Sequence, residues 1–440
     1  MTPIKLQRYL NCLAGMDPIR VNGKVTQVIG LTVESQGPNV GIGEICHIYP
    51  LGNGHPVPAE VVGFKDNRVL LMPLGDIGAV GPGCEVAATG SPLTIKVGYE
   101  LLGHVLDALG NRLDLESLPL TLEDFPIQNQ PPNPLLRPRI KEPLSVGVRV
   151  IDSLLTVGKG QRVGIFAGSG VGKSTLLGMI ARNTKADVNV IGLIGERGRE
   201  VIEFLEKDLG PEGLSRSIVV VATSDQPALL RIKAALTATA IAEFFRDRGR
   251  DVMLLMDSVT RFAMAGRELG LAIGEPPATR GYTPSVFATL PKLLERTGTS
   301  RLGTITAFYT VLVDGDDMND PIADTVRGIL DGHIVLNRKI AQSGHFPAID
   351  VMASVSRVMN DIVDDKHKEA ARQMKKMIAI YKDAEDLINI GAYKTGSNRE
   401  IDLAIKYRPL IQDFLTQGTH ESSSFEDAIH TLKTHFGYGG

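Results

Sequence analysis

The sequence predicts an α/β protein of three parts, in which a small β-barrel precedes an α/β core and an α-helical domain closes the chain. Three observations predict this fold class. Short β-rich runs lie between about residues 21 and 89, apolar runs alternate with helical patterns from about residue 160 to 310, and helical periodicity dominates after about residue 360. With 440 residues, the chain is long enough for two or three domains.

Composition excludes several classes of function. The 47 Lys and Arg residues against 50 Asp and Glu residues give a formal charge of −3, whereas proteins that wrap nucleic acid usually carry a strong basic excess. Three widely spaced cysteines form neither a disulfide framework nor a metal-binding pattern. The sequence has no run of ~20 apolar residues and no signal-peptide pattern, so we expect a soluble, cytoplasmic protein.

Residues 21–90 are expected to form the barrel. Gly, Pro and Asn separate the β-rich runs at roughly 8–12-residue spacing, which is typical of a small barrel or sandwich. The expected runs include 24–31, 45–49, 59–64 and 68–72.

Residues 91–358 are expected to form the core. Its segment 119–143 carries seven prolines and is expected to be an extended connector, because proline lacks a backbone donor and fixes φ. Parallel strands need crossover helices, so the alternation that follows predicts a sheet covered on both faces. The expected strands are 162–166, 188–194, 218–222, 252–256 and 303–309.

Residues 359–440 are expected to form the helical domain. Apolar residues at i, i+3 and i+4 spacing give one face of a helix, and we interpret that face as ordinary core packing. The face consists of Met374, Met377, Ile378, Tyr381, Leu387 and Ile388.

The strongest motif is a glycine-rich loop, 167–175, which lies between an apolar run and a helical one, as a P-loop requires. Glycines allow successive N–H groups to face phosphate oxygens, and the helix N-terminus adds a positive dipole end. Lys173 is expected to reach the β- and γ-phosphates of ATP, and Ser174 to bind Mg²⁺. Ala167 replaces the usual first glycine, at the end of the strand. The core is therefore predicted to be a P-loop (RecA-like) domain, with the nucleotide-binding residues Gly168, Ser169, Gly170, Val171, Gly172, Lys173, Ser174 and Thr175.

Two acidic residues follow apolar runs, which places them at strand ends beside this loop. Asp257 is expected to hold Mg²⁺ directly or through water, although a helix cap is an alternative role. Glu196 is expected to align and polarise the attacking water. Without its context, Glu196 would be interpreted as a solvated loop residue.

Further motifs, in order and spacing from about residue 21 to 415, resemble the catalytic subunits of rotary ATPases. They are 139–144, 147–152, the P-loop, 195–197, Asp257 with Arg261, and 347–357. Within that superfamily, the segments 30–35, 166–175 and 284–296 are most similar to type III secretion ATPases. The earliest of these segments favours the flagellar export ATPases over their injectisome relatives.

The resemblance implies a homohexameric, Mg²⁺-dependent ATPase that energises flagellar protein export by unloading chaperone–cargo complexes at a membrane gate. Glu196 would be the catalytic carboxylate, and Arg197 would lie near the γ-phosphate. Arg357 would be an arginine finger that reaches the nucleotide of the adjacent subunit, which ties catalysis to assembly. Phe346 occupies the place of an adenine-stacking tyrosine.

The resemblance also implies partners and a location. The implied partners are a stator or regulator, a central shaft protein and export-gate membrane proteins, with no nucleic acid. Residues 1–20 would bind the regulator and the membrane, so the protein would lie peripherally on the inner face of the plasma membrane. Segment 391–398 lacks the acidic run of rotary synthase β subunits, so the shaft contact is expected to differ. Segment 414–420 lacks the aromatic that closes the adenine pocket, for which Phe425 is a weak candidate.

Four other functions are alternatives. An injectisome ATPase would use the same chemistry on different cargo, and an ATP synthase catalytic subunit is disfavoured by the missing acidic run. A nucleic-acid motor of the termination-factor type is disfavoured because 21–89 contain only two aromatic and three basic residues. A catalytically inactive ring component is disfavoured by the presence of Glu196, Lys173 and Arg357.

Overall fold

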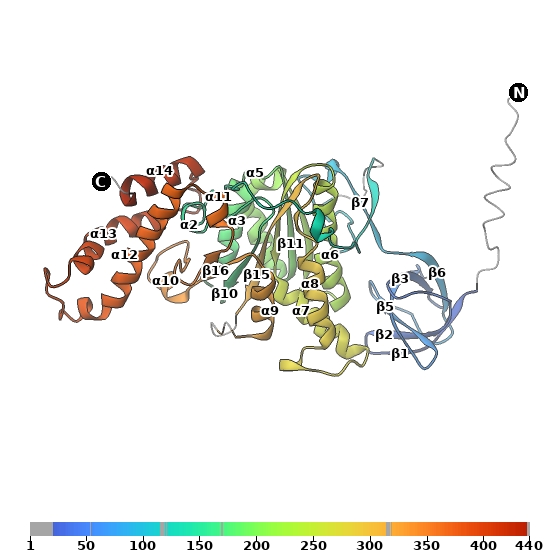
Figure 1. Cartoon of the computed structure of the whole chain (residues 1–440). Coiled ribbons are helices and arrows are strands. Elements are labelled where there is room, and N and C mark those ends of the chain that lie inside the picture. The colour runs from blue at the N-terminus through green and yellow to red at the C-terminus, as the bar shows by residue number, and fades with distance from the viewer. Residues whose placement is uncertain are drawn as a thin grey trace, which may run out of the picture. The chain divides into compact units, whose positions relative to one another are not determined.

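The computed structural model describes residues 21–437 apart from 53, 115–118, 120, 169, 314–316 and 318. The chain divides into two compact units, the first ending at Leu93 and the second beginning at Thr94. The predicted fold class is confirmed: a β-barrel, a P-loop core and a helical domain follow one another along the chain (Figure 1). The predicted partner-binding segment 1–20 lies outside the described residues.

The first unit is a closed barrel with the strand order β1-β2-β5-β4-β3-β6. Alternate strand residues, such as Val69 and Leu71, are buried in its core together with the free cysteines Cys46 and Cys84. The run 24–31 is not one strand to its end, because Gly30 with φ +54° makes the turn into a second strand. The strands are β1 (Gly23–Ile29), β2 (Thr32–Gln36), β3 (Glu44–Tyr49), β4 (Val57–Lys65), β5 (Arg68–Pro73) and β6 (Glu85–Pro92).

The second unit is built on a nine-stranded sheet with the order β17-β16-β10-β15-β13-β11-β12-β8, in which β14 pairs with β15 outside this path. All of its strands run parallel except β14 and β17. The five strands predicted from apolar runs are confirmed within three residues at each end. The strands are β8 (Val105–Leu106), β10 (Arg162–Ala167), β11 (Val188–Glu196), β12 (Ser217–Thr223), β13 (Asp251–Asp257), β14 (Gly298–Thr299), β15 (Thr304–Leu312), β16 (Gly332–Leu336) and β17 (Val355–Ser356).

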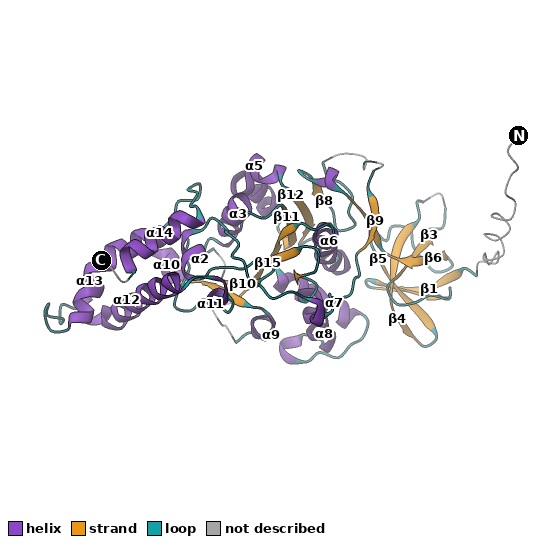
Figure 2. Ribbon diagram, turned by 45° about the horizontal axis from the view of Figure 1, so that its top comes forward, coloured by secondary structure: helices purple, strands orange, loops and turns teal. Residues whose placement is uncertain are grey.

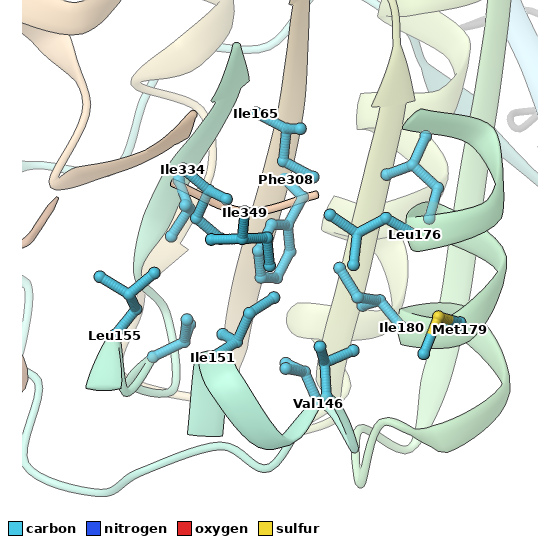
Figure 3. Close-up of a cluster of buried hydrophobic side chains, with 14 of the residues drawn as sticks. Val146, Ile151, Leu155, Ile165, Leu176, Met179, Ile180, Phe308, Ile334 and Ile349 are labelled. Atoms are coloured by element: carbon cyan, nitrogen blue, oxygen red, sulfur yellow. The ribbon is translucent and has the colours of Figure 1, made fainter. Parts of the chain in front are cut away.

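Helices cover both faces of this sheet, as predicted. Alternate residues of strand β11 face opposite sides of the sheet. Ile191 and Leu193 lie in the apolar cluster on the side of α3, whereas a Cβ at Gly192 would contact Ala238 of α6 on the other side. Side chains of α2 and α3 pack on the sheet in that cluster (Figure 3). The helices are α2 (Arg149–Leu154), α3 (Lys173–Asn183), α4 (Gly198–Glu203), α5 (Gly210–Ser215), α6 (Ala228–Arg246), α7 (Val259–Ala272), α8 (Pro284–Leu294), α9 (Pro321–Ile329) and α10 (Arg338–Gln342), with a π-helical turn at Phe204–Leu209.

The proline-rich segment runs along the core with little regular structure. It contains β9 (Glu123–Pro126), which pairs with β7 (Thr94–Val97), and a 3-10 turn at Pro134–Leu136. Two buried or half-buried arginines anchor it: Arg296 donates to the carbonyl oxygen of Ile127 at 2.9 Å, and Arg137 donates to that of Thr297 at 2.7 Å. Arg296 is also paired with Glu243 at 2.6 Å, and the two side chains are only 3% and 1% exposed.

The helical domain forms an extended bundle at one end of the second unit (Figure 2). The predicted apolar face lies on α12, where Met374 is buried in the core, but Leu387 is 50% exposed. The prediction of ordinary core packing is therefore wrong for the far end of α12. The beginning of α12 is instead contacted by α2 and α14, where His367 bonds to the carbonyl oxygen of Ser153 and Lys433 to Asp364. The helices are α11 (Met359–Ile362), α12 (Asp365–Asn389), α13 (Arg399–Leu415) and α14 (Phe425–Phe436).

Candidate active site

Parallel strands bring their carboxyl ends to one edge of the sheet, and the polar residues of the site lie there. Strand β10 ends at Ala167 and leads into the P-loop, β11 ends at Glu196, and β13 ends at Asp257. Ligands of open parallel sheets bind at this edge. The predicted positions of Glu196 and Asp257 at the ends of buried strands are therefore confirmed.

The P-loop curls between β10 and α3. Gly170 and Gly172 adopt left-handed φ angles of +77° and +91°, which side-chain-bearing residues rarely adopt. Gly172 immediately precedes α3, whose first residues present their backbone N–H groups and positive dipole end to the loop. Ala167 is 1% exposed and pairs with Leu312 and Leu336 on the two neighbouring strands, so its methyl group lies at the strand end as expected. Ser169, which was assigned to the phosphate site, lies outside the described residues.

Lys173 is held between the two predicted carboxylates. Its Nζ atom lies 2.6 Å from Asp257 Oδ1 and 3.5 Å from Glu196 Oε1. Burial alone would lower the pKa of Lys173, but the facing charges of Asp257 and Glu196 outweigh burial and raise it. The lysine therefore stays protonated, and its ammonium group lies at the carboxyl ends of β11 and β13.

The Glu196 carboxyl is partly buried and faces the Asp257 carboxylate. Burial, followed by the charge of Asp257, raises the pKa of Glu196 to about 7, against the opposing effect of Lys173. The side chain of Glu200, in the first turn of α4, raises this pKa further. Apart from its ion pair with Lys173 at 3.5 Å, Glu196 Oε1 is buried and accepts no hydrogen bond from the described residues. Such an atom is poised to accept a hydrogen bond from a water molecule.

Two residues missed by sequence reasoning complete this cluster. Thr310 of β15 donates its hydroxyl hydrogen bond to Asp257 Oδ1 at 2.8 Å, and it lies on the strand between β10 and β13. The sequence of β15 gave no distinguishing signal for Thr310, because the same strand also contains Thr304 and Thr306. Glu200 was missed because it lies on a short helix whose bounds the apolar pattern did not predict.

The donor chemistry of the site fits a divalent cation. The Asp257 carboxylate, 5% exposed, and the Ser174 hydroxyl at the start of α3 supply the hard oxygen ligands that Mg²⁺ prefers. The Thr175 hydroxyl is engaged elsewhere, because it hydrogen bonds to the half-buried Asp208 carboxylate. Ser174 and Asp257 are therefore the residues that would hold the ion.

Phe346 lies beside the P-loop. A Cβ built on Gly172 would lie 3.7 Å from the Phe346 ring, which is contributed by the loop after α10. Phe346 is 45% exposed, so part of its ring is available to a ligand. The alternative aromatic, Phe425, instead packs edge-to-face on His367, with ring centroids 6.4 Å apart.

The two predicted arginines are not brought into the cluster. The Arg197 side chain is 81% exposed and lies 3.6 Å from Glu200. The backbone N–H of Arg357 bonds to Asp331 O, and that of Asp331 bonds to Arg162 O, so Arg357 is level with the start of β10. The P-loop follows the other end of β10, about 17 Å away at ~3.3 Å per residue. Arg357 is exposed, and it lies too far from the P-loop of its own subunit for direct contact.

These features define a P-loop nucleotide-binding protein in which a core sheet lies between a β-barrel and a helical domain in the sequence. More narrowly, the chain belongs to the ATP synthase alpha/beta family, as the resemblance in its motifs predicted. The nucleotide-binding domain model of that family matches residues 147–356, and its β-barrel domain model matches 25–90. A third model, the T3SS EscN ATPase C-terminal domain, matches 363–434.

Similar proteins point to one branch of the family. The chain is 61% identical over 430 residues to a flagellum-specific ATP synthase of Bacillus subtilis, covering 98% of each chain. It is 51% identical to a type 3 secretion system ATPase of Xanthomonas euvesicatoria, covering 93% of each. The assembled ATPase EscN of enteropathogenic E. coli superposes with a TM-score of 0.87 at 48% identity, covering 94% of this chain and 99% of that chain. Among the described residues, no helix combines the length and apolar character needed to cross a bilayer.

Proposed function

We propose that this chain is an ATP hydrolase that works as a homohexameric ring and energises flagellar type III protein export. The observation that carries the proposal is the cluster of Lys173, Asp257 and Glu196 beside the P-loop. The relatives named flagellum-specific ATP synthase support the flagellar assignment, because their similarity extends over nearly the whole chain.

The P-loop residues 168–175 are proposed to hold the phosphates of ATP. Their N–H groups and the N-terminus of α3 supply positive electrostatic potential, and Lys173 adds a full charge. In this structure, Lys173 is paired with Asp257. A γ-phosphate would compete for the same ammonium group, so nucleotide binding exchanges one anion for another. Phe346 offers its exposed ring to the adenine base.

Ser174 and Asp257 are proposed to hold Mg²⁺, whose charge, when it is bound, offsets that of the phosphate oxygens. Thr310 fixes the Asp257 carboxylate through its hydrogen bond. Two of the groups that contact Asp257, Lys173 and Thr310, share its Oδ1 atom. These two contacts leave the other oxygen, Oδ2, as the one that would be available to the ion.

Glu196 is proposed to hold the attacking water. Its buried Oε1 atom accepts a hydrogen bond from that water and aligns it with the γ-phosphorus. The new P–O bond forms as the bond to the leaving oxygen of ADP breaks, giving ADP and inorganic phosphate. Lys173 stabilises the charge on the transferred group throughout.

Arg357 is proposed to act on the nucleotide of the adjacent subunit. Its position at the far end of β10 and its exposure support a role at a subunit interface. The assembled structure of EscN, a relative at 48% identity, supports a ring. An arginine finger supplied by a neighbour is worth ~10³–10⁵ in rate, so an isolated subunit would be nearly inactive. Arg197 is proposed to approach the γ-phosphate, which requires it to leave Glu200.

The remaining proposals concern partners and location. A central shaft protein is supported by the structure of EscN in complex with its central stalk EscO. The other proposed partners are a stator or regulator, export-gate membrane proteins and chaperone–cargo complexes, with the ring cytoplasmic and peripheral to the inner face of the plasma membrane. An injectisome ATPase is the second candidate, supported by the type 3 secretion relative at 51% identity. Restoration of motility to a flagellar-export null strain would separate the two functions.

The experiment that tests the proposal is ATPase rate against protein concentration for the native chain, Glu196→Gln and Arg357→Ala. We expect specific activity to rise with concentration as rings assemble, and both variants to lose it while Arg357→Ala still binds nucleotide. A specific activity independent of concentration, with Arg357→Ala fully active, would mean that each subunit works alone.

A further inference from the structure

A buried glutamine joins the segment after α13 to two other parts of the site. Gln417 is 3% exposed and follows α13 by two residues. Its backbone N–H donates to the carbonyl oxygen of Phe346 at 2.9 Å. Its side-chain Oε1 accepts from the backbone N–H of Arg149 at 2.7 Å.

The side-chain amide of Gln417 uses both kinds of hydrogen-bonding group. Its Nε2 donates to the carbonyl oxygens of Gly147 and Glu421, each at 2.9 Å. A buried amide whose donors and acceptor are all paired fixes its neighbours, because each lost bond would leave a buried polar atom unsatisfied.

Two of the four hydrogen-bond partners of Gln417 lie near the P-loop or its helix: Phe346 lies beside Gly172, and Gly147 contacts the far end of α3. Gly147 is packed so closely on Asn183, the last residue of α3, that a Cβ at Gly147 would lie 2.2 Å from the Asn183 side chain. Arg182 of the same helix donates to the carbonyl oxygen of Thr419 at 2.6 Å. The far end of α3, whose first residue is Lys173, is therefore tied to segment 417–421, and through the Gln417 backbone to Phe346.

We propose that Gln417 is a positioning residue that holds the Phe346 ring in place beside Gly172 of the P-loop. The adenine base and the phosphates of one nucleotide can then be bound at the same time. The inference rests on the proposed nucleotide-binding function. Gln417 contacts no phosphate; it acts through the carbonyl group of Phe346 and the 147–149 segment. Its contribution is therefore specific to ligands that carry a base.

The test compares two ligands that differ in the adenosine group. Binding of ADP and of inorganic pyrophosphate, each with Mg²⁺, is measured by calorimetry on the full chain. For Gln417→Ala, we expect ADP to bind about 5- to 30-fold more weakly, the effect of a largely lost stacking contact, and pyrophosphate affinity to change by less than about twofold. Gln412→Ala, at an exposed glutamine on α13, is the matched control and is expected to bind both ligands as the native chain does.

Three results would overturn the inference. Equal weakening of ADP and pyrophosphate would assign Gln417 a general structural role, and unchanged ADP binding would remove it from the site. Additive effects of Gln417→Ala and Phe346→Ala in a double-mutant cycle would show that the two residues act independently, whereas we expect no further loss in the double variant. Failure of the native chain to bind either ligand would refute the proposed function instead.

A measurement on the native chain keeps the inference testable where Gln417→Ala does not fold. Amide hydrogen exchange in peptides covering 145–150 and 414–421 is followed with no ligand, with pyrophosphate and with ADP. We expect ADP to slow exchange in both peptides and pyrophosphate to leave both unchanged. Equal protection by the two ligands, or by neither, would contradict the positioning role.

Discussion

Removal of the Glu200 carboxylate is expected to shift the pH dependence of hydrolysis toward acid. The pKa of Glu196 is raised to about 7 by burial and by Asp257, with a further contribution from Glu200. In the proposed role, Glu196 must be ionised to accept a hydrogen bond from the attacking water, so we expect kcat/KM to rise with pH and to reach its plateau above the pKa. At pH 6, about one tenth of the Glu196 side chains are ionised, and kcat/KM is expected to be about tenfold below the plateau.

Glu200→Ala removes one carboxylate that opposes ionisation of Glu196, so the midpoint of the profile moves to lower pH. The assay is kcat/KM for ATP at saturating Mg²⁺ between about pH 5.5 and 9. Glu203→Ala is the matched control, because Glu203 lies on the same helix but pairs with Arg199.

The comparison also distinguishes titration of Glu196 from titration of the substrate ATP, since a phosphate group itself titrates near pH 6. A titration of ATP gives the same midpoint in all three proteins. Equal midpoints for the native chain, Glu200→Ala and Glu203→Ala would refute the assignment of the profile to Glu196.

Three further changes have defined outcomes. Lys173→Ala is expected to reduce nucleotide affinity by at least tenfold in a binding titration, since it removes the buried charge that we propose binds the phosphates; native affinity would remove Lys173 from the phosphate site. Arg296→Ala leaves the buried Glu243 charge unpaired and is expected to lower the free energy of unfolding by about 3–5 kcal/mol, measured in urea. Lys376→Ala, which breaks an exposed ion pair, is expected to lower it by under about 1 kcal/mol. Equal losses in the two variants would contradict this reasoning. Gly172→Ala forces a side chain into φ +91° against Phe346 and is expected to weaken ADP binding several-fold, so an unchanged calorimetric affinity would refute it.

The sequence predicted the parts of the fold that depend on local pattern. Buried parallel strands are continuous apolar runs, so β11 and β13 were predicted near their true bounds, and with them Glu196 and Asp257 at the carboxyl edge. The two-residue strand β17 has no apolar pattern of its own. Its pairing with β16 depends on the tertiary fold, and it fixes where Arg357 lies.

Contacts between residues far apart in the sequence could not be predicted from local hydrophobic patterns. Thr310 and Asp257 are 53 residues apart, and Gln417 and Gly147 are 270 apart. Segment 414–420 was interpreted only from the missing aromatic of the adenine pocket. The residue of this segment that the structure singles out is Gln417, whose buried amide makes hydrogen bonds to Arg149, Gly147 and Glu421. The exposed end of α12 was also missed, because helical periodicity does not reveal where the covering element stops.

The central claim is that each site is completed by a residue of the neighbouring subunit, and mixing two inactive variants tests it most directly. Arg357→Ala retains Glu196, and Glu196→Gln retains Arg357, so a site formed by the first variant beside a subunit of the second has both groups. With equal amounts and random assembly in a ring, about one quarter of the interfaces are complete. We predict that the mixture regains up to about a quarter of native activity, although each variant alone is inactive. A mixture as inactive as its two components would contradict the claim.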